Sequence, residues 1–238
     1  MDAIITTGAI VGLLLLVGGL LGLLDRRGFS FAWLLVAAAL VFVNDILLTN
    51  AYGLIPNVLP GAEWNWQGKT LALLGTLAIA SHKQFGWRRS GITLVQAKGS
   101  LRSCAPVAIG YCLFFVTIAV AFPNEPASAE TIAFQLTMPS LEEEPFYRGI
   151  LLLALYEAFA GRYRALGIDW SWGAILACLL FGLGHAFGYS DGQFSFDPIY
   201  MALTTIPSLL AVWLRLRSGS LLLPVVLHSV GNSIPLLI

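Results

Sequence analysis

The feature that most constrains this chain is a series of apolar segments, each close to the length that crosses a lipid bilayer. Residues 3–24 contain no charged side chain, and a helix needs about 20 apolar residues to cross the hydrocarbon core. Further predominantly apolar segments occupy residues 29–48, 70–81, 104–122, 141–160, 170–187, 198–214 and 220–238. The sequence therefore predicts an all-α fold, a polytopic transmembrane bundle of about eight helices, in which residues 70–81 form the shortest helix.

The composition agrees with this fold class. Of the 238 residues, 58% are hydrophobic and only 11% are charged, whereas soluble domains carry about 25% charged residues. The formal net charge is zero, which disfavours a nucleic-acid partner. The cysteines lack ligand-like spacing and are interpreted as small core residues. We expect one integral membrane domain over residues 1–238, with helices that carry no motif in residues 1–99.

The basic residues separate the predicted loops into two sets. All 13 Lys and Arg residues except Lys69 and Arg148 fall in alternate loops. Because positive charge is retained on the cytoplasmic side of a membrane, both termini are expected outside. The compact chain indicates a prokaryotic plasma membrane. Residues 92–101 are predicted to form an amphipathic helix along the membrane surface, and Pro139 is expected to kink or break the helix that contains it.

Three consecutive carboxylates stand before Arg148 at the start of an apolar segment. A charge inside the bilayer costs about 2.5–3.5 kcal/mol, so such residues need a partner or a function. Residues four apart share a helix face, so Glu144 is expected to pair with Arg148, which leaves Glu143 free for chemistry. The alternative is a capped helix N-terminus, with Pro145 in its first turn and Glu142 on a solvated acidic edge.

Two later apolar helices also carry polar side chains. His185 lies among several glycines, and His228 and Asn232 are four residues apart on one face of the last helix. Such groups serve either as packing contacts between helices or, if they converge, as donors to a developing oxyanion. Because three helices carry ionisable or amide groups within the membrane, a shared functional site is favoured.

This set of residues points to hydrolysis without a covalent intermediate. It offers a carboxylate base, two imidazoles and an amide donor, and no cysteine stands beside a histidine to act as a nucleophile. The combination suits activation of water for attack on an amide, with no cofactor. A zinc site formed by Glu143, His185 and His228 is the alternative, although the helical His-Glu-x-x-His motif is absent.

Three motifs resemble the signature of a known family. Glu143-Glu144-x-x-x-Arg148, Phe181-x-x-x-His185 and His228-x-x-x-Asn232 occur in this order. They are similar to the motifs of the CAAX-protease and bacteriocin-processing family, the Rce1-like or Abi intramembrane endopeptidases, and the resemblance covers residues 100–238 as a catalytic core. It implies a membrane-embedded cavity and cleavage of a peptide bond near a substrate's membrane-proximal end or C-terminal tail.

The resemblance also implies a role for each motif residue. Glu143 becomes the water-activating base, assisted by His185, while His228 and Asn232 become the oxyanion site. The Glu144–Arg148 pair supports them, and the family's glutamate-type mechanism needs no metal. Expected partners are membrane lipids and a peptide or protein substrate, with or without a lipid modification. A site in the outer half of the membrane would favour exported or membrane-anchored substrates.

Other functions compete with an endopeptidase. A close variant is a transpeptidase that transfers the cleaved tail in C-terminal sorting. A different class is a non-enzymatic membrane protein, such as a bacteriocin-immunity factor or a scaffold. A transporter would suit Pro207 and the internal charges, but the chain has no inverted repeat. Replacing Glu143 by Gln separates chemistry from these binding functions.

Overall fold

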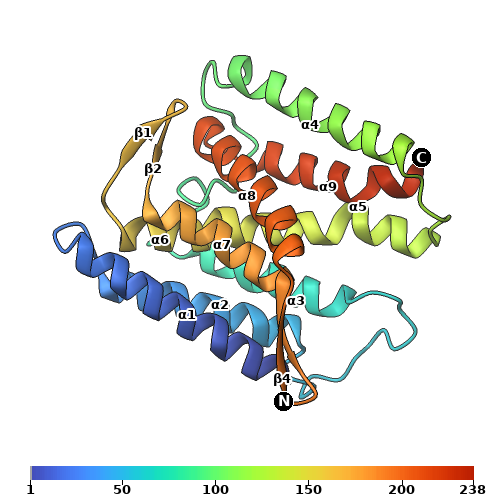
Figure 1. Ribbon diagram of the computed structural model, residues 1–238, viewed down its shortest axis with the longest axis horizontal. Coiled ribbons are helices and arrows are strands. Elements are labelled where there is room, and N and C mark those ends of the chain that lie inside the picture. Colours follow the sequence, from blue (N-terminus) through green and yellow to red (C-terminus); the bar gives the residue numbers. More distant parts are fainter. Residues whose placement is uncertain (1) are drawn as a thin grey trace.

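Helices dominate the computed structural model, which describes residues 2–238. Within these residues they are α1 (Asp2–Leu24), α2 (Phe31–Leu48), α3 (Trp66–Ser81), α4 (Leu101–Ala121), α5 (Ala129–Glu143), η1 (Glu144–Leu151), α6 (Leu152–Ala158), α7 (Trp172–Ala186), α8 (Pro198–Ser218) and α9 (Leu222–Leu237). The segments α5, η1 and α6 follow one another without interruption, so the described chain forms eight rods (Figure 1). The predicted all-α bundle is confirmed.

Several of these helices have the dimensions of membrane spans. By length and composition, α1, α2, α4 and α8 can cross a bilayer, and α7 and α9 are shorter apolar helices. The outer face of α4 leaves Ile109, Leu113, Phe114 and Val120 exposed. An apolar surface of this kind suits contact with lipid rather than with water.

The connections between helices gather at two opposite ends of the bundle. The α1–α2, α3–α4, α6–α7 and α8–α9 connections lie at one end, and the remaining connections lie at the other with the two ends of the described chain (Figure 1). The basic residues that the sequence assigned to alternate loops therefore lie at the first end. Lys69, in the first turn of α3, lies toward the other end.

The long rod does not begin where the sequence suggested. It starts at Ala129, where the Ser128 side chain caps it by accepting a hydrogen bond from the Thr131 amide at 3.0 Å. The helix continues past Pro139, so it does not break there. The acidic cluster therefore lies in the middle of a rod, and the alternative of a solvated helix N-terminus is wrong.

The middle of the rod is a π-helical segment, η1, which begins at Glu144. Its second residue is Pro145, which has no N–H to donate to the carbonyl four residues earlier. Helices of this type are rare and concentrate at functional sites. The apolar face of η1 and α6 forms the centre of the core with α2 and α7, through the buried side chains of Phe146, Ile150 and Leu155.

Two β-hairpins extend from the ends of the bundle, and neither was expected from the sequence. Strand β1 (Tyr163–Ala165) pairs with β2 (Ile168–Trp170), and β3 (Phe187–Ser190) pairs with β4 (Gln193–Phe196), both antiparallel. Each has a two-residue turn with positive φ at both positions, Leu166-Gly167 and Asp191-Gly192. An Asp-Gly pair is a strong signal for this turn, so the second hairpin was recognisable.

The amphipathic helix predicted at residues 92–101 is wrong. That stretch is irregular up to the start of α4, with positive φ at Gly91 and Gly99. Its backbone bonds to the α8–α9 connection instead. The Ala97 amide donates to the Ser218 carbonyl at 2.6 Å, and the Leu221 amide donates to the Gly91 carbonyl at 2.8 Å. These contacts to a neighbouring turn replace the hydrogen bonds that a helix would have made.

Candidate active site

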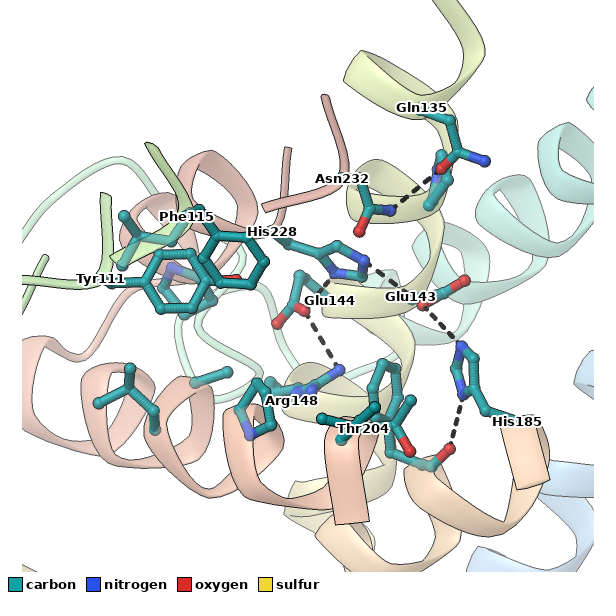
Figure 2. A pocket seen from close by; sticks show the side chains of 18 of the residues that line it. Tyr111, Phe115, Gln135, Glu143, Glu144, Arg148, His185, Thr204, His228 and Asn232 are labelled. Carbon is teal, nitrogen blue, oxygen red and sulfur yellow. Dashed lines mark hydrogen bonds and ion pairs between the residues drawn. The ribbon is translucent and has the colours of Figure 1, made fainter. Parts of the chain in front are cut away.

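One cavity of about 740 Å³ receives side chains from α3, α4, α5, η1, α7, α8 and α9. Its lining includes every residue that the sequence singled out for catalysis: Glu143, Glu144, Arg148, His185, His228 and Asn232. Figure 2 shows these side chains pointing toward one another from separate helices. Residues up to 89 positions apart in the sequence are therefore assembled at one place.

Glu143, the last residue of α5, lies between the two histidines. Its Oε2 atom is 3.9 Å from His185 Nε2 and 3.8 Å from His228 Nε2 (Figure 2). The Glu143 residue is only 8% exposed, and Oε2 forms no hydrogen bond with any residue that the structure describes. A buried carboxylate oxygen without a bond of its own is a site to which a small polar molecule can bind.

The hydrogen bonds of the two imidazoles fix which nitrogen faces Glu143. His185 Nδ1 lies 2.8 Å from the Phe181 carbonyl oxygen, one helical turn earlier on α7. A carbonyl only accepts, so Nδ1 carries the proton and Nε2 of the neutral ring is an acceptor. His228 Nδ1 lies 2.8 Å from Glu144 Oε1, so it also carries a proton. Both Nε2 atoms are thus directed at Glu143.

The predicted pair of Glu144 with Arg148 is present within η1. Arg148 Nη1 lies 3.2 Å from Glu144 Oε1, and the two residues are 2% and 0% exposed. The Arg148 guanidinium lies over the Phe181 ring, 4.0 Å from its centroid. Phe181 therefore orients His185 through its carbonyl and supports Arg148 through its ring.

Asn232 lies one turn after His228 on α9 and faces the same cavity. Its Nδ2 donates to Gln135 Oε1 on α5 at 3.2 Å (Figure 2). An amide nitrogen has two hydrogens, so the second remains available for another acceptor. Gln135 was not expected from the sequence, and a single amide in an apolar helix gives little signal.

The site contains a cation that lies outside the three sequence motifs. Lys69 Nζ lies 2.5 Å from Glu143 Oε1 and 2.8 Å from Glu142 Oε2. Asn44 Nδ2, on α2, donates to Glu142 Oε1 at 3.2 Å. Glu142 is 0% exposed, so its assignment as a solvated cap is wrong. The sequence feature that could have pointed to Lys69 was charge balance, because three adjacent carboxylates need more than one cation when they are buried.

The residues that could hold a metal are those of the zinc alternative: Glu143, His185 and His228. Over residues 2–238, no group of three or more His, Cys, Asp and Glu side chains is arranged as a metal site. In addition, the Lys69 ammonium is bonded to the carboxylate that would ligate the metal. A positive charge in contact with the ligating carboxylate repels a divalent cation at the same carboxylate. The donor set therefore fits a metal poorly while Lys69 is in place.

Residues 126–234 match the family model described as Type II CAAX prenyl endopeptidase Rce1-like. The matched region contains all three motifs, so the suspected relationship to this family is confirmed. It does not include Lys69 or Asn44. No curated protein and no solved structure matches the chain. At the level of the family, the match indicates a CAAX-type membrane endopeptidase, and together with the apolar helices it indicates an integral membrane protein.

Proposed function

Because residues 126–234 form an Rce1-like domain in an integral membrane protein, we propose that this chain is a glutamate-type intramembrane endopeptidase. It hydrolyses a peptide bond near the membrane-proximal end or C-terminal tail of a membrane-associated or exported substrate. The observation that carries the proposal is the position of Glu143 Oε2, which faces the Nε2 atoms of His185 and His228 within 3.9 Å inside the cavity. A water bound among these three atoms would have acceptors for both of its hydrogens.

The proposed reaction begins with removal of a proton from this water. Glu143 accepts the proton as general base, and His185 Nε2 accepts a hydrogen bond from the remaining O–H. The water oxygen bonds to the carbonyl carbon of the scissile peptide. The proton then passes from Glu143 to the leaving nitrogen, and the C–N bond breaks. The products are a new carboxyl terminus and a free amine.

The negative charge of the tetrahedral intermediate needs hydrogen-bond donors. Asn232 Nδ2 supplies one from its remaining hydrogen, and His228 supplies another from Nε2 when its ring is protonated. The adjacent carboxylate of Glu144, 2.8 Å from His228 Nδ1, stabilises that imidazolium. Donors that are already in place before the reaction contribute about 2.7–4 kcal/mol each to transition-state stabilisation.

We propose that this chemistry uses no metal. The support is the Lys69 ammonium on Glu143, which satisfies the carboxylate electrostatically and opposes a second cation. Treatment of the purified protein with a chelator is expected to leave cleavage unchanged. Loss of cleavage that added Zn²⁺ restores would assign zinc to Glu143, His185 and His228 instead.

We also propose that the basic end of the bundle is cytoplasmic and that the cavity lies toward the opposite end. The cavity lining includes Trp64 and Asn65 from the α2–α3 connection and Thr131 from the first turn of α5, all at the end opposite the basic loops. Retention of positive charge in the cytoplasm then places the site in the outer half of the membrane. This position suits substrates that are exported or anchored at the outer surface.

The function is tested by comparing membrane-protein termini, by mass spectrometry, between cells with the native protein and cells with Glu143→Gln. The substitution keeps the size of the side chain and removes the base. Uncleaved precursor tails are expected only in the variant, and their sequences identify the substrate. The matched control is Glu125→Gln, in the exposed α4–α5 connection, which should cleave normally. Identical termini in all three strains would refute the proposal, and tails joined to a new acceptor would indicate a transpeptidase.

A further inference from the structure

We propose that Lys69 is a positioning residue for Glu143, and that through it the N-terminal helices, outside the family match, complete the active site. This inference rests on the proposed function. Apart from Arg148 in η1, Lys69 is the one basic residue that does not fall in the alternate loops that carry positive charge. Its ammonium contacts Glu143 Oε1 at 2.5 Å, on the opposite oxygen from the one that faces the histidines.

The Glu143 carboxylate is oriented by its contact with Lys69. The terminal torsion of a Glu side chain is broad and roughly two-fold, so the carboxylate plane is not fixed by the backbone. An ion pair to Oε1 removes this freedom and directs Oε2 at His185 and His228. Without Lys69, either oxygen could turn toward the imidazoles or away from them.

Lys69 is itself held in place. Its Nζ also contacts Glu142 Oε2 at 2.8 Å, and Glu142 Oε1 accepts from Asn44 on α2. The resulting chain of contacts runs from α2 through Glu142 and Lys69 to Glu143. Because the Lys69 side chain is 15% exposed, little solvent is available to replace these partners.

The start of α3 is fixed to its neighbours. The Asn65 side chain caps α3 by accepting from the Gly68 amide at 3.0 Å, and it donates to the Leu48 carbonyl at 2.9 Å. A Cβ on Gly68 would lie 2.1 Å from that same carbonyl. The Trp66 indole donates to Glu130 on α5 at 3.0 Å. The backbone that carries Lys69 is therefore bonded to α2 on one side and to α5 on the other.

A positioning role and a merely structural role predict different kinetics. If Lys69 orients Glu143, its loss lowers kcat, because a small misplacement of a catalytic group can cost about 10²-fold. The KM should change less than about threefold, since Lys69 does not need to touch the substrate. If Lys69 only balances charge, kcat per folded molecule stays unchanged and only the amount of folded protein falls.

The experiment measures kcat and KM for cleavage of a peptide that contains the site identified in the Glu143→Gln comparison. Lys69→Met removes the ammonium, and Lys69→Arg, which keeps a cation, should recover part of the lost kcat.

Lys69→Met alone leaves two carboxylates without their cation and can fail to fold. The double variant Lys69→Met with Glu142→Gln removes one charge of each sign, keeps the amide contact to Asn44, and should still show a kcat about 10²-fold below native. Lys83→Met, in the exposed α3–α4 connection, is the control.

A second measurement tests whether Lys69 acts through Glu143. In a Glu143→Gln background, Lys69→Met should cause no further loss of the residual rate, because the effects of substituting residues that act as one unit are not additive. The Lys69 proposal would be overturned if the folded fraction of the Lys69→Met, Glu142→Gln variant had the native kcat. It would also be overturned if Lys69→Met lowered the rate of the Glu143→Gln protein by the same factor as it lowers the native rate. Neither result would contradict the endopeptidase itself. If the native protein itself cleaves nothing, both proposals fail together.

Discussion

Five charged side chains lie together in the interior of the bundle: Lys69, Glu142, Glu143, Glu144 and Arg148. Buried charges are tolerated where each has a partner, and removal of one partner leaves the other uncompensated. Here the three carboxylates share two cations and the His228 imidazole. The cluster therefore constrains which substitutions the fold can accept, independently of any effect on catalysis.

Arg148→Met is expected to destabilise the protein by about 3–5 kcal/mol, the cost of breaking one side of a buried ion pair. Glu144, at 0% exposure, would lose its cation, and the Phe181 ring would lose the guanidinium above it. Denaturant unfolding in detergent measures the change.

The matched control for this substitution is Arg164→Met in the β1–β2 hairpin. Arg164 also forms an ion pair, to Asp169 at 2.9 Å, but the two side chains are 63% and 54% exposed. Its loss should cost less than about 1 kcal/mol. Equal effects of the two substitutions would contradict the importance of the buried cluster.

The sequence predicted the cavity residues that belong to motifs, but not those that stand alone. A spacing of four predicted that Glu144 lies beside Arg148 and that His228 lies beside Asn232, because residues four apart share one face of a helix. Lys69 and Gln135 contact their partners across 74 and 97 residues respectively. Periodicity within one helix contains no information about such contacts between helices.

At the scale of elements, the position of His185 depends on a close contact between α7 and α8. A Cβ on Gly182 would lie 2.1 Å from Thr205 Oγ1 and 2.7 Å from the Met201 sulfur. Small residues allow helices in membranes to approach this closely. Gly182 lies three residues before His185, so the same contact fixes the part of α7 that carries the imidazole.

Gly182→Ala is therefore expected to destabilise the bundle by about 1–3 kcal/mol, the usual cost of overpacking, and to lower the thermal unfolding temperature in detergent. Gly110→Ala in α4 provides the control, because nothing lies within 4 Å of its added Cβ. That substitution should be neutral or stabilising by up to about 1 kcal/mol, since Ala favours a helix over Gly. A Gly182→Ala protein as stable as the Gly110→Ala protein would contradict the close contact.

The elements that the sequence failed to predict have no distinctive sequence pattern. The π-helical turn begins at Glu144, and an apolar pattern cannot distinguish a π turn from an α turn over eight residues. Residues 92–101 have a helix-like pattern, but positive φ at Gly91 and Gly99 and bonds to the α8–α9 connection hold them irregular. The long apolar helices were predicted well because length alone identifies them.

At the scale of the whole molecule, the proposed orientation predicts which residues react with a membrane-impermeant thiol reagent in intact cells. With Cys104, Cys112 and Cys178 replaced, a cysteine at Gln193 in the β3–β4 hairpin should be labelled. A cysteine at Arg164 should be labelled only after the membrane is permeabilised, since the basic end faces the cytoplasm.

Both labelling positions are exposed in the structure, so a difference between them reports the side of the membrane rather than burial. If the cysteine at Arg164 is labelled in intact cells and the cysteine at Gln193 is not, the orientation in the membrane is the reverse of the proposed one. It would also place the cavity mouth toward the cytoplasm and change the class of substrate that can reach it.

The order of the site residues along the chain has a consequence for biosynthesis. Lys69 lies in α3, Glu143 at the end of α5, His185 in α7, and His228 and Asn232 in α9. Because a chain is synthesised from its N-terminus, Lys69 is made first and the two site residues of α9, His228 and Asn232, are made last. A nascent chain at the translocon therefore holds no complete set of the proposed catalytic groups until α9 has inserted. In the proposed mechanism, cleavage therefore requires that α9 has inserted and packed against α5.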